Sequence, residues 1–529
     1  MDQRDFALVL VNGLVLMSTY CLAMKQTNID TDHSALLALK NHITSDPHQI
    51  LSKNWSSSSL SSSVCGWIGV RCGPFHRRVT ALDISGMNLT GTVPPHLGNL
   101  SFLVSLDMGN NHFHGTLPRE LSGLRRIRFI RLGSNNFSGT IPTWFGPKLQ
   151  VLALNYNHFD GTIPSSISKL SNLQVLNFKR NSLQGMIPQE IGNLRKLTIV
   201  NLNFNSLIGP IPNSIFNIST LEHIHLTQNN MTGSLPEDIC RHLPNLIGIY
   251  FSHNHLNGLI PPSLSSCSQL HILSLSYNNF SGSIPKELGN LEMLQHLHLG
   301  FNNLEGGVPE EMGNLHNLEQ FTIYNNQISG SIPKGIGNWT KLVNIGLSGN
   351  LLTGAIPEEI GNLHELEYLN AAFMALNGTI PAGIFNISTL ISIYMGVNQF
   401  TGQLPSDACH QSPYLEEIYL SRNKIHGVIP PSIGNCSSLN RMYLTVNQMT
   451  GAIPTSIQNL GNLQQLYLGQ NHFTGSIPAS VGNCSSLVEL DLSVNQLTGS
   501  IPKSLQNLEF LKRLFLRSNY FTGVPFSGS

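Results

Sequence analysis

Four tyrosines recur at intervals of 24 or 25 residues in the C-terminal half of this 529-residue chain, and a phenylalanine continues the series. The series is Tyr394, Tyr419, Tyr443, Tyr467 and Phe515. A tyrosine side chain joins a rigid apolar ring to a hydroxyl group, a combination that suits protein and peptide interfaces. The series therefore predicts a binding stripe, to which Arg422 and Arg441 would add positive charge. The alternative is that the rings pack edge to edge and only stabilise a sheet.

Histidines and aromatic residues form a second candidate cluster earlier in the chain. Its members are His223, His225, Tyr250, His253, Tyr277, His296, His298 and Phe301. We take His225, Tyr250 and His298 as its candidate ligand-binding residues, while a cluster without a ligand remains the alternative. Because imidazole changes charge near neutral pH, binding by this cluster should depend on pH between about 5 and 7.

No motif for catalysis accompanies these clusters. The sequence has no phosphate-binding P-loop, no G-x-S-x-G, no H-E-x-x-H and no kinase signature, so we expect no catalytic residues and no enzyme. Paired C-x-x-C spacing is also missing, and we expect neither metal nor cofactor. The 29 basic and 29 acidic residues balance, which gives no electrostatic footprint for nucleic acid.

The candidate residues are placed by a repeat with the pattern L-x-L-x-x-N-x-L-x-G-x-I-P. Its glycine recurs 19 times from Gly91 to Gly523, at fifteen intervals of 24 residues, one of 22 and two of 25. The L-x-L pair predicts a short strand with inward leucines and outward neighbours. With the first leucine at position 0, the outward positions are −1, +1, +3 and +4, and the tyrosines all occupy +1. Since one repeat cannot bury its own apolar face, the repeats must stack into one solenoid.

The repeated asparagine, present in 17 of the 19 repeats, is expected to bond backbone groups inside the coil. Met87 and Met374 replace it, so this ladder of hydrogen bonds should weaken at two turns.

The Gly-x-Ile-Pro repeat, as in residues 354–357, resembles plant extracellular leucine-rich-repeat receptors. Residues 32–40, Trp55 and residues 65–72 are similar to the N-terminal cap of that family. The likeness is greatest to the receptor-kinase group that includes the receptors for bacterial flagellin, bacterial elongation factor and rice Xanthomonas resistance. It implies an α/β repeat fold, a leucine-rich-repeat solenoid or superhelix of about 19 plant-type repeats. We expect the cap at residues 24–78 and the repeats at residues 79–529.

The cysteines indicate an oxidising compartment. Cys65 and Cys72 lie in the cap motif and are expected to pair. Two further pairs are each 27 residues apart and fall on adjacent turns, at distances that suit disulfides. These pairs are Cys240 with Cys267 and Cys409 with Cys436. The alternative is that Cys267, Cys436 and Cys484 merely replace a core leucine; Cys484 has no partner in either interpretation.

Residues 1–23 are expected to form a secretory signal cleaved after Ala23, with an uncleaved anchor as the alternative. Twelve N-glycosylation sequons support an extracellular location. They are Asn54, Asn88, Asn99, Asn136, Asn217, Asn230, Asn279, Asn338, Asn377, Asn386, Asn435 and Asn483. None occupies an outward strand position, which favours a concave face left open for a partner, although the repeat consensus itself also generates such sequons.

These observations predict an extracellular recognition module that binds a peptide or small protein on its concave face. The resemblance implies immune sensing of a microbial peptide, with a co-receptor kinase ectodomain recruited near the C-terminal repeats. The alternatives are a secreted inhibitor of a pathogen cell-wall-degrading enzyme, or a soluble decoy. No segment after the signal is long and apolar enough to span a membrane, and the chain stops at Ser529 without the family's C-terminal cap. We therefore expect a secreted product or part of a longer receptor at the outer face of the plasma membrane.

Overall fold

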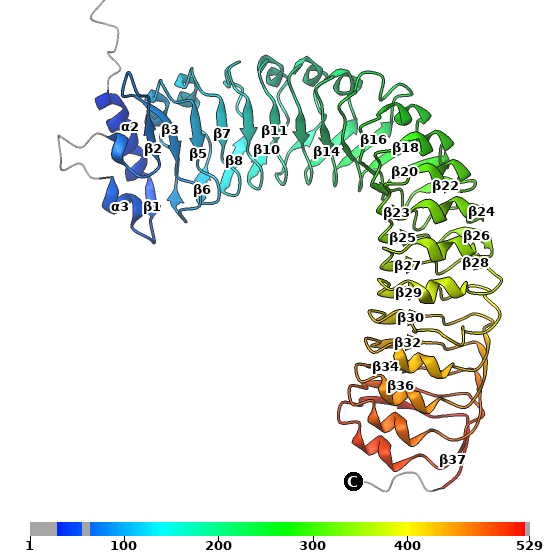
Figure 1. Ribbon diagram of the computed structural model, residues 1–529. Coiled ribbons are helices and arrows are strands. Elements are labelled where there is room, and N and C mark those ends of the chain that lie inside the picture. The colour runs from blue at the N-terminus through cyan, green and yellow to red at the C-terminus, as the bar shows by residue number, and fades with distance from the viewer. Residues whose placement is uncertain (1–28, 56–63, 524–529) are drawn as a thin grey trace, which may run out of the picture. The chain divides into compact units, whose positions relative to one another are not determined.

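A computed structural model describes residues 29–55 and 64–523 (Figure 1). The secretory signal expected at residues 1–23 lies outside the described residues. The chain divides into two compact units, one up to Ser206 and one from Leu207 onward, and each unit is described on its own.

The first unit begins with a cap of short elements. They are α2 (Ile29–Asn41), β1 (Ile43–Ser45), α3 (Ile50–Asn54), the 3₁₀ turn η1 (Val64–Gly66) and β2 (Val70–Cys72). Arg78 and Asp32 form a buried ion pair of 2.7 Å, and Trp55 stacks on Trp67. Asp32 also accepts a hydrogen bond of 2.9 Å from the Val79 amide at the first repeat strand. One buried carboxylate thus ties the cap helix to the repeats, and its charge is compensated by the guanidinium.

Each repeat then places one strand on the strand face, the side toward which the outward positions point. In the first unit these strands are β3 (Val79–Asp83), β5 (Ser105–Asp107), β7 (Phe129–Arg131), β9 (Val151–Ala153), β11 (Val175–Asn177) and β13 (Ile199–Asn201). In the second unit they are β15 (His223–His225), β17 (Gly248–Tyr250), β19 (Ile272–Ser274), β21 (His296–His298), β23 (Gln320–Thr322), β25 (Asn344–Gly346), β27 (Tyr368–Asn370), β29 (Ser392–Tyr394), β30 (Glu417–Tyr419), β32 (Arg441–Tyr443), β34 (Gln465–Tyr467), β36 (Glu489–Asp491) and β38 (Arg513–Phe515).

A second column of short strands includes the repeat's glycine or ends just before it. It comprises β4 (Thr90–Gly91), β6 (His112–Gly115), β8 (Asn136–Thr140), β10 (His158–Asp160) and β12 (Gln184–Gly185), and then β14 (Ser206–Pro210), β16 (Asn230–Ser234), β18 (His255–Leu259), β20 (Asn279–Ser283), β22 (Asn303–Glu305), β24 (Ser329–Ser331), β26 (Leu351–Gly354), β28 (Ala375–Leu376), β31 (His426–Gly427), β33 (Gln448–Gly451), β35 (His472–Phe473), β37 (Thr498–Gly499) and β39 (Tyr520–Phe521).

Most repeats close with a five-residue 3₁₀ helix. These are η2 (Pro95–Asn99), η3 (Arg119–Gly123), η4 (Ser165–Lys169), η5 (Gln189–Asn193), η6 (Asn213–Asn217), η7 (Pro262–Ser266), η8 (Lys286–Asn290), η9 (Glu310–Asn314), η10 (Lys334–Asn338), η11 (Glu358–Asn362), η12 (Ala382–Asn386), η13 (Pro431–Asn435), η14 (Thr455–Asn459), η15 (Ala479–Asn483) and η16 (Lys503–Asn507). No helix among the described residues is both long and apolar enough to cross a membrane.

The repeat that contains β21 shows why these residues form these elements. Leu297 and Leu299 are fully buried, because alternate strand residues point into the core. Gly306 then adopts a φ of +74°, a left-handed conformation that residues with a Cβ resist. Pro309 has an extended backbone with φ fixed near −64° and leads directly into η9.

Neighbouring strands pair in parallel and in register, so equivalent residues lie side by side. Leu297 stands beside Leu273 on one side and Phe321 on the other. The repeated asparagine works as the sequence predicts: the side chain of Asn302 donates to the carbonyls of Leu275 and Leu299 at 3.1 and 3.0 Å. Within each unit, this register therefore aligns each outward residue with the equivalent residues of the neighbouring repeats.

The structure contains the three predicted disulfides, one in the cap and two between adjacent repeats. Cys65 joins Cys72, with Cα atoms 5.4 Å apart. The other two bonds join Cys240 to Cys267 and Cys409 to Cys436, with Cα distances of 5.2 and 5.1 Å. Both begin in 25-residue repeats, where turns replace the 3₁₀ helix, and end just after the 3₁₀ helix of the next repeat. The bonds therefore fasten the two irregular loops to their regular neighbours.

Candidate functional site

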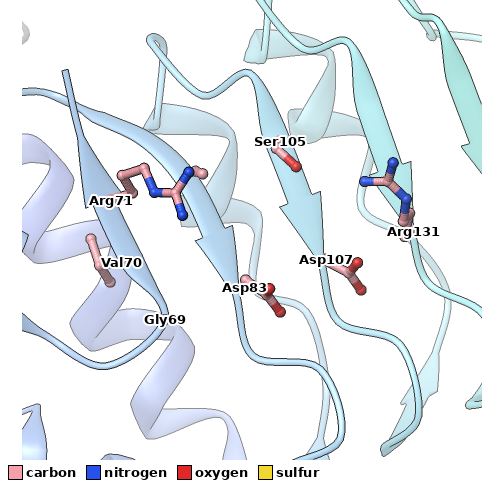
Figure 2. A pocket seen from close by; sticks show the side chains of 8 residues that line it. Gly69, Val70, Arg71, Asp83, Ser105, Asp107 and Arg131 are labelled. Carbon is pink, nitrogen blue, oxygen red and sulfur yellow. The ribbon is translucent and has the colours of Figure 1, made fainter.

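The strand face of the first unit carries a charged pocket, shown in Figure 2. Its volume is about 390 Å³, and Arg71, Asp83, Asp107 and Arg131 line it from β2, β3, β5 and β7. In Figure 2 the two arginines flank the two aspartates. Within the described part of the chain these four groups form no ion pair with one another. Burial raises the pKa of Asp107, and the Asp83 carboxylate raises it further.

The repeat pattern alone does not single out this charged pocket. Asp83, Asp107 and Arg131 hold position +1 of three successive repeats, so their column is visible in the sequence. Arg71 comes from the cap, where the repeat spacing has no predictive value. Only the antiparallel pairing of β2 with β3 places its guanidinium at the same surface.

In the second unit, the four predicted tyrosines form a continuous stack, which we call the tyrosine ladder. Ring centroids are 4.4 Å apart between Tyr394 and Tyr419, 4.4 Å between Tyr419 and Tyr443, and 4.7 Å between Tyr443 and Tyr467. The planes are inclined by only 11° to 16°, so the rings lie face to face rather than edge to edge. Phe515 lies outside the ladder, because Asp491 occupies the position between.

Neighbouring polar side chains accept hydrogen bonds from three hydroxyl groups of the tyrosine ladder. The hydroxyls of Tyr394, Tyr443 and Tyr467 donate to Glu417, Gln465 and Glu489, respectively. All three acceptors hold position −1 on the strand that follows. Burial raises the pKa of Tyr467 to about 12, and the hydrogen bond to Glu489 contributes.

Two arginines complete the polar edge of the ladder. Arg441 pairs with Glu417 at 2.5 Å and also hydrogen-bonds the Tyr419 side chain. Arg513 pairs with Glu489 at 2.9 Å. Arg422, also predicted as a site residue, is exposed in the turn after β30, with a φ of +60°. The tyrosine ladder is therefore assembled before any ligand arrives, with most of its hydroxyls and ring faces already in contact.

The histidine cluster divides into separate stacks. His225 stacks on Tyr250 with centroids 4.1 Å apart, and His253, Tyr277 and Phe301 form a second stack with the same spacing. His298 lies apart from both stacks, and its Nδ1 is 2.9 Å from the Thr322 hydroxyl.

Burial, together with the neighbouring His296, lowers the pKa of His298 to about 4. His298 therefore stays neutral from pH 5 to 7 and cannot supply the pH response expected there. Burial also lowers the pKa of His223.

A hollow of about 540 Å³ opens beside the tyrosine ladder, on the strand face between β19 and β29. We call it the aromatic hollow, after the five aromatic residues in its lining. They are Tyr277, Phe301, Tyr324, Phe373 and Tyr394. The remaining lining residues are Asn325, Ser348, Gly349, Asn370 and Ala372, so no charged side chain lines it.

A hydrogen-bond network holds the floor of the aromatic hollow. The Tyr324 ring extends across Gly346, where a Cβ would collide with it, and its hydroxyl is hydrogen-bonded to Asn370. Ser348 donates to the Asn370 carboxamide oxygen and accepts a bond of 2.8 Å from the Ala372 amide. This hollow was not predicted from the sequence. The available signal is a run of small outward residues at Gly346, Ser348 and Gly349 between aromatic columns.

The sequons lie away from these surfaces. Every sequon asparagine is exposed except Asn54 and Asn99, which are partly buried. The Asn54 side-chain oxygen accepts a bond of 2.6 Å from the Ile68 amide in the cap. Cys484 is buried and unpaired; burial raises the pKa of its thiol to about 11, and its Sγ is 3.2 Å from the Ile457 carbonyl.

Family models for leucine-rich repeats match much of the chain. The N-terminal domain model matches residues 29–73, and the repeat-region model matches residues 248–395. Two further repeat models match residues 147–207 and 413–473, and residues 78–100, 102–124, 220–242 and 486–508.

Curated relatives match over short stretches. The receptor-like serine/threonine-protein kinase EFR of Arabidopsis thaliana is 38% identical over 100 residues, which are 19% of this chain and 9% of that protein. A putative receptor-like protein kinase of the same plant is 38% identical over 105 residues, 19% of this chain and 10% of the relative. The matched stretches thus span about a tenth of the length of these relatives.

Solved structures match over most of the chain. The plant peptide hormone receptor RGFR1 in complex with RGF2 is 34% identical with a TM-score of 0.80, over 83% of this chain and 71% of that one. PEPR1 with AtPEP1 is 31% identical with a TM-score of 0.72, over 94% and 80% of the two chains. The Arabidopsis receptor kinase HAESA, with the peptide hormone IDA and the co-receptor SERK1, is 30% identical with a TM-score of 0.75, over 93% and 90%. The chain belongs to the leucine-rich-repeat family, in the group of plant receptor ectodomains that these structures represent.

Proposed function

We propose that this chain is the ligand-sensing part of a plant receptor kinase and binds a peptide or small protein on its strand face. The observation that carries the proposal is the strand face of the second unit, where stacked aromatic side chains border an uncharged hollow. The similar ectodomains RGFR1, PEPR1 and HAESA were solved in complex with RGF2, AtPEP1 and IDA, which supports the same use of this fold here.

The proposed contact residues all lie on the strand face of the second unit. They are His225, Tyr250, His298, Tyr394, Tyr419, Arg422, Arg441, Tyr443, Tyr467 and Phe515. No sequon occupies an outward strand position, so glycans attached to the predicted sites would leave this face open.

We place the chain outside the cell, either secreted or at the outer face of the plasma membrane as part of a longer receptor. The resemblance to the flagellin and elongation-factor receptors favours immune sensing of a microbial peptide. SERK1 accompanies HAESA in its structure, and we propose that a co-receptor kinase ectodomain likewise joins this chain near its C-terminal repeats. The chain itself would perform no catalysis; it would supply only the binding surface.

A chimera tests this proposal. The full chain is joined to the C-terminal cap, membrane helix and kinase of a receptor with a known cellular response, and the cells are treated with peptide fractions from bacterial culture. We expect a response that disappears when a glycan is introduced beside Tyr394 by Val397→Asn with Gln399→Thr. Asparagine tolerates the φ of +56° at residue 397, so this variant should fold.

The matched control is Glu509→Thr, which creates a sequon at Asn507, at the repeat position of the exposed sequon Asn483. We expect this glycan to leave the response intact. A response that survives the glycan beside Tyr394 would contradict ligand binding on this part of the strand face.

A further inference from the structure

We propose that the aromatic hollow is the subsite for an uncharged aromatic side chain of a peptide ligand. This inference rests on the proposed function and deepens it, because it specifies the ligand chemistry of one place on the strand face. It differs from the binding stripe expected from the tyrosines, whose ring faces and hydroxyls are largely occupied.

The hollow has room because two outward positions of one repeat carry small side chains, and a glycine at a third lets the Tyr324 ring lie across the floor. Gly346, Ser348 and Gly349 occupy positions +1, +3 and +4 around β25, whereas the same columns carry aromatic rings in nearby repeats. A volume of about 540 Å³ falls within the range of roughly 300–1,000 Å³ typical of small-ligand sites. The space is sufficient for an aromatic side chain together with the peptide backbone that bears it.

The walls offer exposed aromatic surface. Phe373 is 66% exposed, Tyr277 43% and Phe301 38%. All three have positive φ, between 55° and 57°, which bulky residues rarely adopt. The repeat imposes this conformation at position +4, and glycine or asparagine meets it there with less strain, as at Gly349 and Asn325. Bulky rings held in a strained conformation and left exposed around one hollow give it an apolar wall that a partner could cover.

The polar groups of the hollow suit a peptide backbone. Asn325 is exposed, and within residues 29–55 and 64–523 its carboxamide has no side-chain hydrogen bond, although its backbone amide donates to Ser348 at 2.9 Å. A free carboxamide offers one acceptor and two donor hydrogens, which match the N–H and C=O of a peptide group. The Tyr324–Asn370–Ser348 network keeps the rest of the floor rigid.

The uncharged lining of the hollow disfavours charged ligand side chains. A carboxylate or ammonium group entering the hollow would lose water without gaining a counterion, because no lining residue is charged. An aromatic ring instead gains apolar burial and offset stacking against Phe373 or Phe301. The hollow should therefore prefer phenylalanine to alanine and should reject glutamate and lysine.

Capped tripeptides test this preference. Acetyl-Gly-Phe-Gly-amide and its counterparts with alanine, glutamate or lysine at the centre are titrated against the full chain, and binding is followed by ligand-observed NMR. We expect the phenylalanine peptide to bind at least about tenfold more tightly than the other three. Equal binding of the phenylalanine and alanine peptides would overturn the proposal.

Two variants locate the binding. Phe373→Ala removes a wall, and Gly349→Asn fills the floor with a residue that accepts a φ of +72°. Both should reduce phenylalanine-peptide affinity to the level of the alanine peptide. The matched control is Phe204→Ala, at the same repeat position with a φ of +59° in the other unit, which should change nothing. If both hollow variants retain full affinity, the proposal is wrong.

The tripeptide assay and the chimera fail independently. Tripeptide selectivity that maps to the hollow, without a response from the chimera, would support the subsite and contradict the receptor function. A chimera that responds, together with tripeptides that do not discriminate, would support the receptor function and overturn the subsite.

Discussion

The tyrosine ladder and the aromatic hollow are neighbours on one sheet and are both rich in aromatic residues, yet they offer opposite surfaces. The ladder rings share position +1, whereas the rings of the hollow come mainly from positions +3 and +4. In the ladder, four successive strands carry tyrosine at position +1, and each ring covers the next at 4.4 to 4.7 Å. In the hollow, position +1 on β25 is Gly346, which the Tyr324 ring covers, while Phe373, Tyr277 and Phe301 leave aromatic surface exposed.

This difference shows that the number of aromatic residues on a repeat surface does not predict its availability. In a solenoid, each outward side chain lies beside its counterpart from the next repeat. The side chains of a regular column therefore cover one another's contact surfaces. Where the column is interrupted, the Phe373 ring and the Asn325 carboxamide are left exposed. The break in the repeat therefore offers the more open contact surface, and the ladder contributes stability besides the ligand contacts proposed for it.

The largest expected effect concerns His298, on β21. Its pKa is about 4 in the folded chain against 6.5 when unfolded, so the unfolded chain binds protons more readily between these values. Its stability contribution is therefore present above pH 6.5 and lost as pH falls to about 4, by at most about 3 kcal/mol. His298→Gln should reduce the acid sensitivity of urea unfolding, whereas the exposed control His472→Gln should not. His296 acts on His298 electrostatically, the Thr322 hydroxyl is 2.9 Å from its Nδ1, and Glu319 lies 3.9 Å from His296.

The second largest effect is expected from a substitution that fills the floor of the aromatic hollow. Gly346→Ala places a Cβ against the Tyr324 ring, which must move and lose its hydrogen bond to Asn370. Overpacking of this kind typically costs about 1–3 kcal/mol, and we expect about 2 kcal/mol in urea unfolding. Gly461→Ala is the control, because a Cβ there meets nothing within 4 Å. Selectivity for the phenylalanine tripeptide should disappear only with the first substitution; if it persists, the floor does not shape the subsite.

Much of the fold, but less of the site, was predictable from the sequence. Spacing predicted the repeats, the asparagine hydrogen bonds and two of the three disulfides, because each depends on where residues fall in successive repeats, whereas the Cys65–Cys72 bond was predicted from the cap motif. The pairing of Tyr443 with Gln465 and the position of the Tyr324 ring over Gly346 depend instead on side-chain conformation between neighbouring repeats. Repeat spacing contains no information about that conformation. The tyrosine series was correctly located on one column, but whether it binds a ligand remains a prediction.

A central rung of the ladder tests the stabilising role. Tyr443→Ala removes two stacking contacts, with Tyr419 and Tyr467, and leaves Gln465 without its donor. Aromatic pairs contribute about 0.5–1.5 kcal/mol each beyond area burial, so we expect a loss of about 2 kcal/mol, against less than about 1 kcal/mol for Tyr443→Phe. Tripeptide affinity at the hollow should not change, since residue 443 does not line it. A Tyr443→Ala chain as stable as the wild type would contradict the view that the ladder stabilises the sheet.

The smallest expected effect distinguishes the tyrosine ladder from the aromatic hollow by how each responds to high pH. The folded pKa of Tyr467 is raised from 10 to about 12 by burial and by its bond to Glu489, so its contribution to stability is present below pH 10 and is lost as pH rises toward 12. Because the ring is partly exposed, solvent screening should limit the contribution to about 1 kcal/mol. Tyr467→Phe should therefore flatten the alkaline limb of the unfolding curve, while the exposed control Tyr520→Phe should not. Tyr467 does not line the hollow, and the one phenol–carboxylate bond at its border is that of Tyr394 with Glu417. As the pH is raised, tripeptide affinity should therefore begin to fall at the same pH in Tyr467→Phe and in the wild type. An earlier fall would mean that the ladder supports the hollow as well as the sheet.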